Sequence, residues 1–118
     1  MSKGRQAALE RLLHMMEAVQ AIETYAARGR EAFDGDPVLR DAILYQIVVL
    51  GEAAKSALIA DPSIEKDLPD VEWSPIARMR DRVTHHYWAT DREVVWQTAT
   101  ESAAELRTAL AAALKRLS

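Results

Sequence analysis

The sequence predicts an all-α fold: a small antiparallel bundle of four helices that forms a single domain over residues 1–118. Two observations predict this class. Only four glycines and four prolines occur among 118 residues that are rich in alanine, leucine, glutamate and arginine, a composition that favours helix over sheet. Apolar residues recur at three- and four-residue spacing, the period of a buried helix face. A chain of this length can bury a core of its own, so we expect short connections between helices that pack side by side.

The first two helices are delimited by glycine and proline. Apolar spacing predicts a helix over residues 4–28, with Gly29 as its stop. Asp36 and Pro37 read as an N-cap followed by proline at the first helical position, so a second helix begins there and runs to about Ala60. Proline ends that helix, and residues 61–73 are expected to form a loop. The expected inward residues are Leu9, Leu12, Leu13, Met16, Val19 and Ile22 in the first helix, and Leu39, Ile43, Ile47, Leu50, Ala54 and Leu58 in the second.

Two further helices are expected after the loop. Ser74-Pro75 repeats the pattern of cap and proline, which predicts a third, shorter helix. Thr90 and Glu93 match a capping box, so a last helix is expected to run to about Arg116. Its expected inward residues are Val95, Ala99, Leu106, Leu110 and Ala113.

The apolar stripes of the first two helices are wide. Met15 adjoins Met16, and Tyr45, Val48 and Val49 widen the second helix beyond one seam. A face wider than a small bundle can bury predicts a partner surface, most simply that of a homodimer. The alternative is a monomer in which the second helix is central.

Composition excludes several classes of function. The chain has no cysteine, which excludes a disulfide framework, a thiolate metal site and a cysteine nucleophile. A net charge of −3 argues against a protein that coats nucleic acid through bulk positive charge. No uninterrupted apolar run approaches the roughly 18 residues of a membrane span, so a cytoplasmic protein without membrane contact is expected.

Basic and imidazole side chains are concentrated in one stretch, Arg80-Asp81-Arg82-Val83-Thr84-His85-His86-Tyr87. Guanidinium groups bind phosphate in a planar fork, and imidazole exchanges protons near neutral pH. Metal-free cleavage of RNA needs a base, an acid and cationic donors that hold the phosphorane charge. The stretch therefore predicts a site that handles a phosphodiester, in which Asp81 could orient a neighbouring side chain. Solvated arginines and histidines that cap a helix end are the structural alternative.

Helix geometry limits how this stretch can act. Arg80 and His85 are five residues apart, so they point about 140° apart on a regular helix. For both to meet one phosphate, the helix must end or kink near Thr84, or a second subunit must supply one group. Glu52 has two interpretations: it reaches an arginine of the stretch, or it pairs on the surface with Lys55. No spacing of ligands typical of a metal site is present, and we expect no metal or cofactor.

The spacing Arg80-x4-His85-x-Tyr87 resembles the R-x4-H-x-Y signature of HepT-like proteins, in the HEPN superfamily of helical-bundle ribonucleases. Gly51-Glu52-Ala53-Ala54-Lys55 is similar to the "I-G-E-A-A-K" segment of that family. Further similarities lie at Tyr25 and Phe33, at Val71-Glu72-Trp73, and at Asp91 and Trp96. The chain departs from the family pattern at Thr84, which replaces an apolar residue, at His86, which replaces a frequent glycine, and at Asp81, which replaces the commoner asparagine.

The resemblance implies the toxin of a toxin–antitoxin pair, a metal-independent endoribonuclease whose site lies where two subunits meet in a homodimer. It implies Arg80 and His85 as catalytic residues, supported by Asp81, Arg82, His86 and Glu52. It implies a nucleotidyltransferase antitoxin of the MntA type that silences the toxin by attaching AMP to Tyr87. The alternative is a non-catalytic module that binds a nucleotide or a partner and regulates the nucleotidyltransferase.

Overall fold

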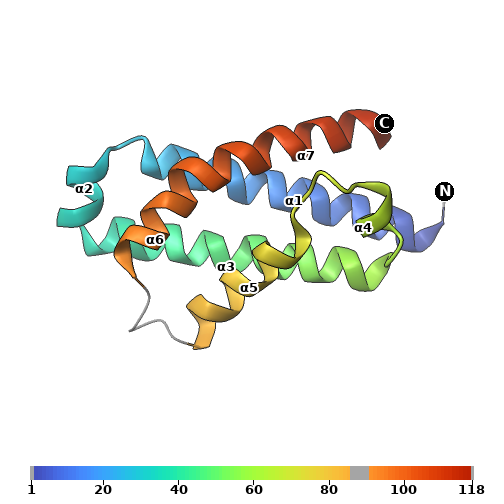
Figure 1. Cartoon of the computed structure of the whole chain (residues 1–118), viewed down its shortest axis with the longest axis horizontal. Coiled ribbons are helices and arrows are strands. Elements are labelled where there is room, and N and C mark those ends of the chain that lie inside the picture. The colour runs from blue at the N-terminus through green and yellow to red at the C-terminus, as the bar shows by residue number, and fades with distance from the viewer. Residues whose placement is uncertain (1, 86–90, 118) are drawn as a thin grey trace.

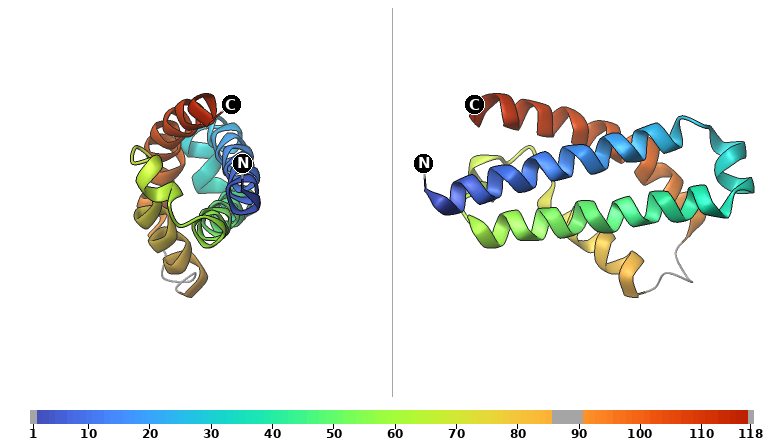
Figure 2. Two further views of the ribbon diagram at one scale, coloured as in Figure 1. Left: turned by 90° about the vertical axis from the view of Figure 1, so that its right-hand side faces the viewer. Right: turned by 180° about the vertical axis from the view of Figure 1, so that it is seen from behind.

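The computed structural model of the chain describes residues 2–85 and 91–117. These residues form helices and turns without a strand, which confirms the predicted all-α class. Three helices run side by side along the molecule: α1 (Lys3–Ala26), α3 (Pro37–Ala60) and α7 (Ala103–Leu117) (Figure 1). α5 (Trp73–His85) packs mainly against α3, and its far end leans away from the bundle (Figures 1 and 2).

The hairpin of α1 and α3 follows the sequence prediction closely. Asp36 caps α3, since its carboxylate accepts a hydrogen bond of 3.0 Å from the backbone N–H of Val38. α1 ends at Ala26, two residues earlier than predicted. The chain then turns at Gly29, whose φ of +96° is the one positive φ among the described residues. A side chain at that position would be strained, so glycine permits the turn.

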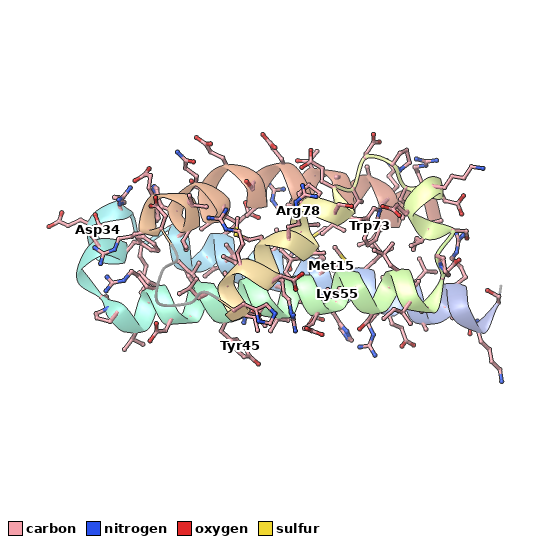
Figure 3. All side chains as sticks on the ribbon, turned by 60° about the horizontal axis from the view of Figure 1, so that its bottom comes forward. Met15, Asp34, Tyr45, Lys55, Trp73 and Arg78 are labelled. Atoms are coloured by element: carbon pink, nitrogen blue, oxygen red, sulfur yellow. The ribbon has the colours of Figure 1, made fainter. Side chains whose placement is uncertain are left out.

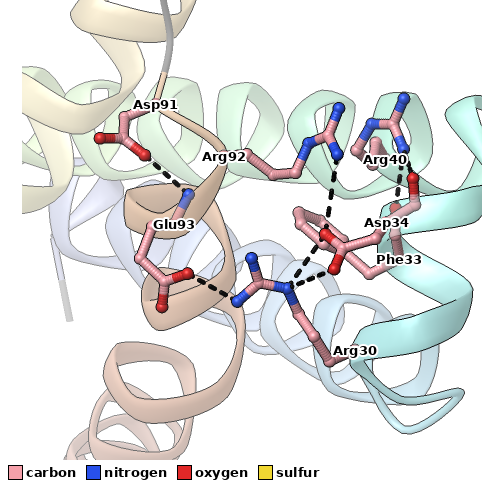
Figure 4. A network of polar contacts seen from close by, with 7 residues as sticks. All are labelled: Arg30, Phe33, Asp34, Arg40, Asp91, Arg92 and Glu93. Carbon is pink, nitrogen blue, oxygen red and sulfur yellow. Dashed lines mark hydrogen bonds and ion pairs between the residues drawn. The ribbon is translucent and has the colours of Figure 1, made fainter.

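A short helix, α2 (Arg30–Gly35), occupies the turn and was absent from the predicted four-helix count. Phe33 is fully buried, and its ring lies 5.0 Å from that of Trp96. Arg30 lies 5.9 Å from both ring centres and forms ion pairs of 3.0 Å with Asp34 and 2.6 Å with Glu93 (Figure 4). Partners more than 60 residues away thus hold α2, and local sequence patterns do not reveal them.

The segment predicted as a loop over residues 61–73 contains another helix, α4 (Ile64–Asp67). Ile64 is fully buried, and Arg5 of α1 forms ion pairs with Asp61 and Asp67 on either side of it. α5 begins at Trp73, one residue before the predicted Ser74. The indole N–H of this buried tryptophan donates to a backbone carbonyl of the α4–α5 turn at 3.3 Å.

The last helix differs from the prediction at its start and in its middle. α6 (Arg92–Gln97) is capped by Asp91, whose carboxylate accepts from the N–H of Glu93 at 2.8 Å. Thr90, the predicted cap, lies outside the described residues. A π-helical turn, Thr98–Ser102, joins α6 to α7. Within it, the hydroxyl of Thr100 donates to the carbonyl four residues back at 2.8 Å, a contact that often accompanies a bent helix.

The core confirms most of the predicted inward residues. All five positions of the last helix are buried, and so are Leu39, Ile43, Ile47, Leu50 and Ala54 of α3. Leu13 was predicted to face inward, but its side chain is 52% exposed because Met15 takes the core position of that turn. Tyr45 is 65% exposed, and Val48 and Val49 are half-buried. The homodimer inferred from this wide stripe stays a prediction.

α3 has the length and composition of a membrane span, with a mean hydropathy of 1.5 over its most apolar window. Its apolar residues pack against α1 on one side and α5 on the other. The core helix of a soluble protein passes the same test of length and composition, and less than half of this window of α3 is buried.

Candidate active site

The site begins with a close approach between α3 and α5. Gly51 of α3 is buried, and a Cβ built on it would lie 2.1 Å from the Cβ of Arg80 and 2.5 Å from its Cγ. No residue larger than glycine fits this crossing unless the helices move apart. Gly51 therefore lets the stem of Arg80 lie directly on the backbone of α3.

Two ionic contacts with α3 fix the arginine and its neighbour. The guanidinium of Arg80 forms an ion pair with Glu52 and a second one, of 3.0 Å, with Asp81. Asp81 also accepts a hydrogen bond of 3.0 Å from the ammonium of Lys55. Of the two interpretations of Glu52, the contact with an arginine of the cluster is the one observed, because Lys55 pairs with Asp81 instead.

These contacts stabilise the charged forms of both partners. The hydrogen bond to Asp81 raises the pKa of Arg80 above its ordinary value, burial opposes this rise, and the negative charge of Glu52 adds to it. Hydrogen bonds from Lys55 and then from Arg80 lower the pKa of Asp81. The side chain of Arg80 is 21% exposed, and its Nε atom is buried without a hydrogen-bond partner among the described residues. The result is a fixed cation that is largely buried and has one buried nitrogen, Nε, without a partner among the described residues.

His85 and Arg82 lie on other faces of α5. Both are exposed, and α5 remains helical through His85. Arg80 and His85 of one subunit therefore point about 140° apart, as the spacing predicted. The first of the two expected solutions was a helix that ends or kinks near Thr84, and α5 does end at His85, one residue later, but both Arg80 and His85 still lie within its helical part. His86 and Tyr87 lie outside the described residues.

The structure adds two residues that the sequence analysis did not assign to the site. Gly51 makes room for Arg80, and Lys55 holds Asp81. Gly51 and Lys55 are the first and last residues of the segment Gly51-Glu52-Ala53-Ala54-Lys55, so their closeness to Glu52 in the sequence could have indicated that they belong to the site. Elsewhere, no three histidine, aspartate or glutamate side chains within residues 2–85 and 91–117 gather closely enough to hold a metal ion.

Comparison with known proteins identifies the family of the chain. The family model described as "Ribonuclease HepT-like" matches residues 15–113. The chain belongs to the HepT-like family, and its activity class is that of a ribonuclease. The matched region contains Gly51, Glu52 and Lys55 of α3 as well as Arg80 and His85 of α5.

Two relatives are also named as ribonucleases. A protein of Thermococcus cleftensis named "Probable ribonuclease HepT" is 32% identical over 93 residues, which cover 77% of this chain and 81% of the relative. A protein of Caldanaerobacter subterraneus named "Putative RNase TTE0752" is 31% identical over 98 residues, 83% of each chain. No solved structure matches the chain.

Proposed function

We propose that this protein is the toxin of a toxin–antitoxin pair and acts on RNA as a metal-independent endoribonuclease, with Arg80 and His85 as catalytic residues. Its membership in the HepT-like family supports the reaction class. The observation that carries the residue assignment is the fixation of Arg80 by Glu52 and Asp81, on the same helix as an exposed imidazole five residues further on. A cation held in place before the substrate arrives stabilises developing charge without reorganisation.

Each group has a role in the displacement. His85 takes the proton of the 2′-hydroxyl, whose oxygen attacks the adjacent phosphorus, and the departing 5′-oxygen receives a proton from an imidazolium. Arg80 holds the negative charge of the phosphorane, and Asp81 keeps that guanidinium oriented. Arg82 and His86 support phosphate binding. One imidazole cannot serve at both ends of an in-line displacement in a single step, so a second subunit supplies the other.

The homodimer is part of this proposal because the two catalytic residues face apart within one subunit. A two-fold axis near the end of α5 would bring Arg80 of one copy beside His85 of the other. Mixing wild-type and His85→Ala proteins in equal amounts, with exchange of subunits verified by mass, tests the shared site. If each site needs His85 of both subunits, only dimers of two wild-type copies cleave RNA, so the activity falls to about a quarter of that of the same total amount of wild type. A fall to only about one half would exclude a site that needs both imidazoles.

Cleavage itself is tested with purified protein and tRNA or mRNA in the presence of EDTA. Arg80→Ala and His85→Ala should each abolish cleavage, whereas Arg28→Ala is the matched control, since Arg28 is exposed and lies in the turn between α1 and α2. Equal cleavage by all three variants would overturn the assignment, and loss of wild-type activity in EDTA would overturn the metal-free mechanism. Stable RNA binding with no cleavage would favour the alternative function, a non-catalytic binding module.

Control by a partner enzyme completes the proposal. A nucleotidyltransferase of the MntA type would transfer AMP from ATP to the hydroxyl of Tyr87 in the cytoplasm, with release of pyrophosphate and of the phenol proton. The added phosphate would repel the RNA backbone from the catalytic histidine. Intact-mass measurement after co-expression with such an enzyme should show added AMP units in the wild type and none in Tyr87→Phe. An unmodified wild-type mass would exclude this control.

A further inference from the structure

Three cationic or proton-accepting side chains form a line along the outer face of α5. Arg78, Arg82 and His85 are spaced by four and three residues, which on a helix places them within about 60° of one another. All three are exposed. Figure 3 shows Arg78 on the side of α5 away from α3. Arg80 lies on the nearly opposite face, so this line is separate from the fixed arginine.

The two arginines of this line are not neutralised by the rest of the protein. Other arginines of the chain are paired: Arg80 with Glu52, and Arg30 with Asp34 and Glu93. Within residues 2–85 and 91–117, the side chains of Arg78 and Arg82 form no ion pair or hydrogen bond. Exposed cations without a partner keep their full attraction for a polyanion, and releasing counterions from its phosphates adds to binding.

Acidic residues limit where a polyanion can lie. Asp70 and Glu72 precede α5, and Glu105 lies across from them on α7, where all three line a groove of about 170 Å³ between the two helices. Carboxylates repel phosphate, so a strand is excluded from that groove and from the start of α5. The outer face from Arg78 to His85, about 10 Å of helix at 1.5 Å per residue, has one carboxylate beside it, Asp81, which is already paired with Lys55 and Arg80.

We propose that Arg78 and Arg82 form a phosphate-binding track that holds single-stranded RNA along α5 and leads it to His85. This inference rests on the proposed ribonuclease function and adds Arg78 as a substrate-binding residue. Contact with the backbone makes the track insensitive to base sequence. It also makes catalysis depend on substrate length, because only a strand that extends beyond the cleaved bond reaches Arg78.

Binding is tested with RNA that is fully 2′-O-methylated, which keeps its phosphates but lacks the attacking hydroxyl. Fluorescence anisotropy against salt concentration compares wild type, Arg78→Gln and the charge-matched control Arg28→Gln, whose side chain is exposed and lies outside α5. Arg78→Gln should weaken binding about five- to tenfold and reduce the salt slope by about one, whereas Arg28→Gln should match the wild type. Equal affinities and slopes for all three proteins would overturn the track.

Kinetics separate the track from a structural role. With RNA of about 20 nucleotides, Arg78→Gln should raise KM several-fold and leave kcat within twofold, whereas a dinucleotide, whose single phosphodiester lies at His85 and leaves no phosphate for Arg78, should show a far smaller change in KM. A fall in kcat on both substrates would instead place Arg78 in the chemistry or the fold and would overturn the track. If the wild type binds RNA but never cleaves it, the proposed function fails while the binding result still decides the track.

Discussion

The crossing of α3 and α5 at Gly51 makes a quantitative prediction for Gly51→Ala. A Cβ at this position would lie 2.1 Å from the Cβ of Arg80, whereas ordinary contacts of a Cβ begin at 3.4 Å. The helices must therefore separate by roughly 1 Å or more, or the stem of Arg80 must leave its place. Both responses displace the guanidinium from Glu52, and a shift of about 1 Å in a positioning group lowers catalysis about 100-fold.

Gly35→Ala is the matched control. Gly35 also lies in a helix, with φ outside the left-handed region, and a Cβ built there meets nothing within 4 Å. Both variants gain helix propensity of up to about 1 kcal/mol, but only Gly51→Ala is overpacked, at about 1–3 kcal/mol. Gly51→Ala should therefore be less stable than Gly35→Ala by that difference, with a Tm lower by about 4–12 °C.

Urea denaturation and RNA cleavage, measured on the same two preparations, check the prediction. The expected result is a lower urea midpoint and about 100-fold lower kcat/KM for Gly51→Ala, with Gly35→Ala at or above the wild type in stability and equal to it in activity. Gly51→Ala that matches Gly35→Ala in both measurements would refute the close approach of α3 and α5.

Three further predictions concern the ionic contacts. Glu52→Gln should lower kcat about tenfold and leave KM nearly unchanged, because Arg80 loses the ion pair that orients it. The free energy of unfolding should fall by less than about 1 kcal/mol, because the partly exposed pair contributes little to stability and no core side chain is removed. A kcat equal to that of the wild type would show that Glu52 does not act in the site. Arg30→Ala should lower Tm by about 2–6 °C, since it removes the contact of the guanidinium with the rings of Phe33 and Trp96 and its ion pair with Glu93 of α6. An unchanged Tm in calorimetry would show that these contacts do not stabilise the fold. The pKa of Asp61 is lowered by Ser63 and by Arg5, so the unfolded state binds more protons and the stabilisation is present above about pH 4 and lost below it. Urea midpoints measured against pH should fall less steeply below pH 4 in Asp61→Asn, and parallel curves would contradict this linkage.

The sequence predicted the long helices well because their boundaries are local chemistry. Asp36 caps α3 and Pro37 starts it, and the buried positions of α3 follow the helical period. α2 and α4 were missed because each has fewer residues than are needed to recognise the helical repeat of apolar residues. Both are held by contacts distant in sequence: Phe33 on Trp96, and Arg5 on residues flanking Ile64. The inward prediction for Leu13 was wrong because periodicity alone does not decide which of two adjacent apolar faces meets the core.

The candidate site divides in the same way. The sequence by itself determined the helical class, the cluster of Arg80 and His85, and the angle that keeps them apart on one helix, because residue spacing fixes these properties. Only the tertiary structure decided the partner of Glu52 and the role of Gly51. Both depend on how α3 and α5 cross, and a crossing is set by side chains of two helices that are about 30 residues apart in the chain. The arginine is therefore oriented by packing that no local pattern encodes.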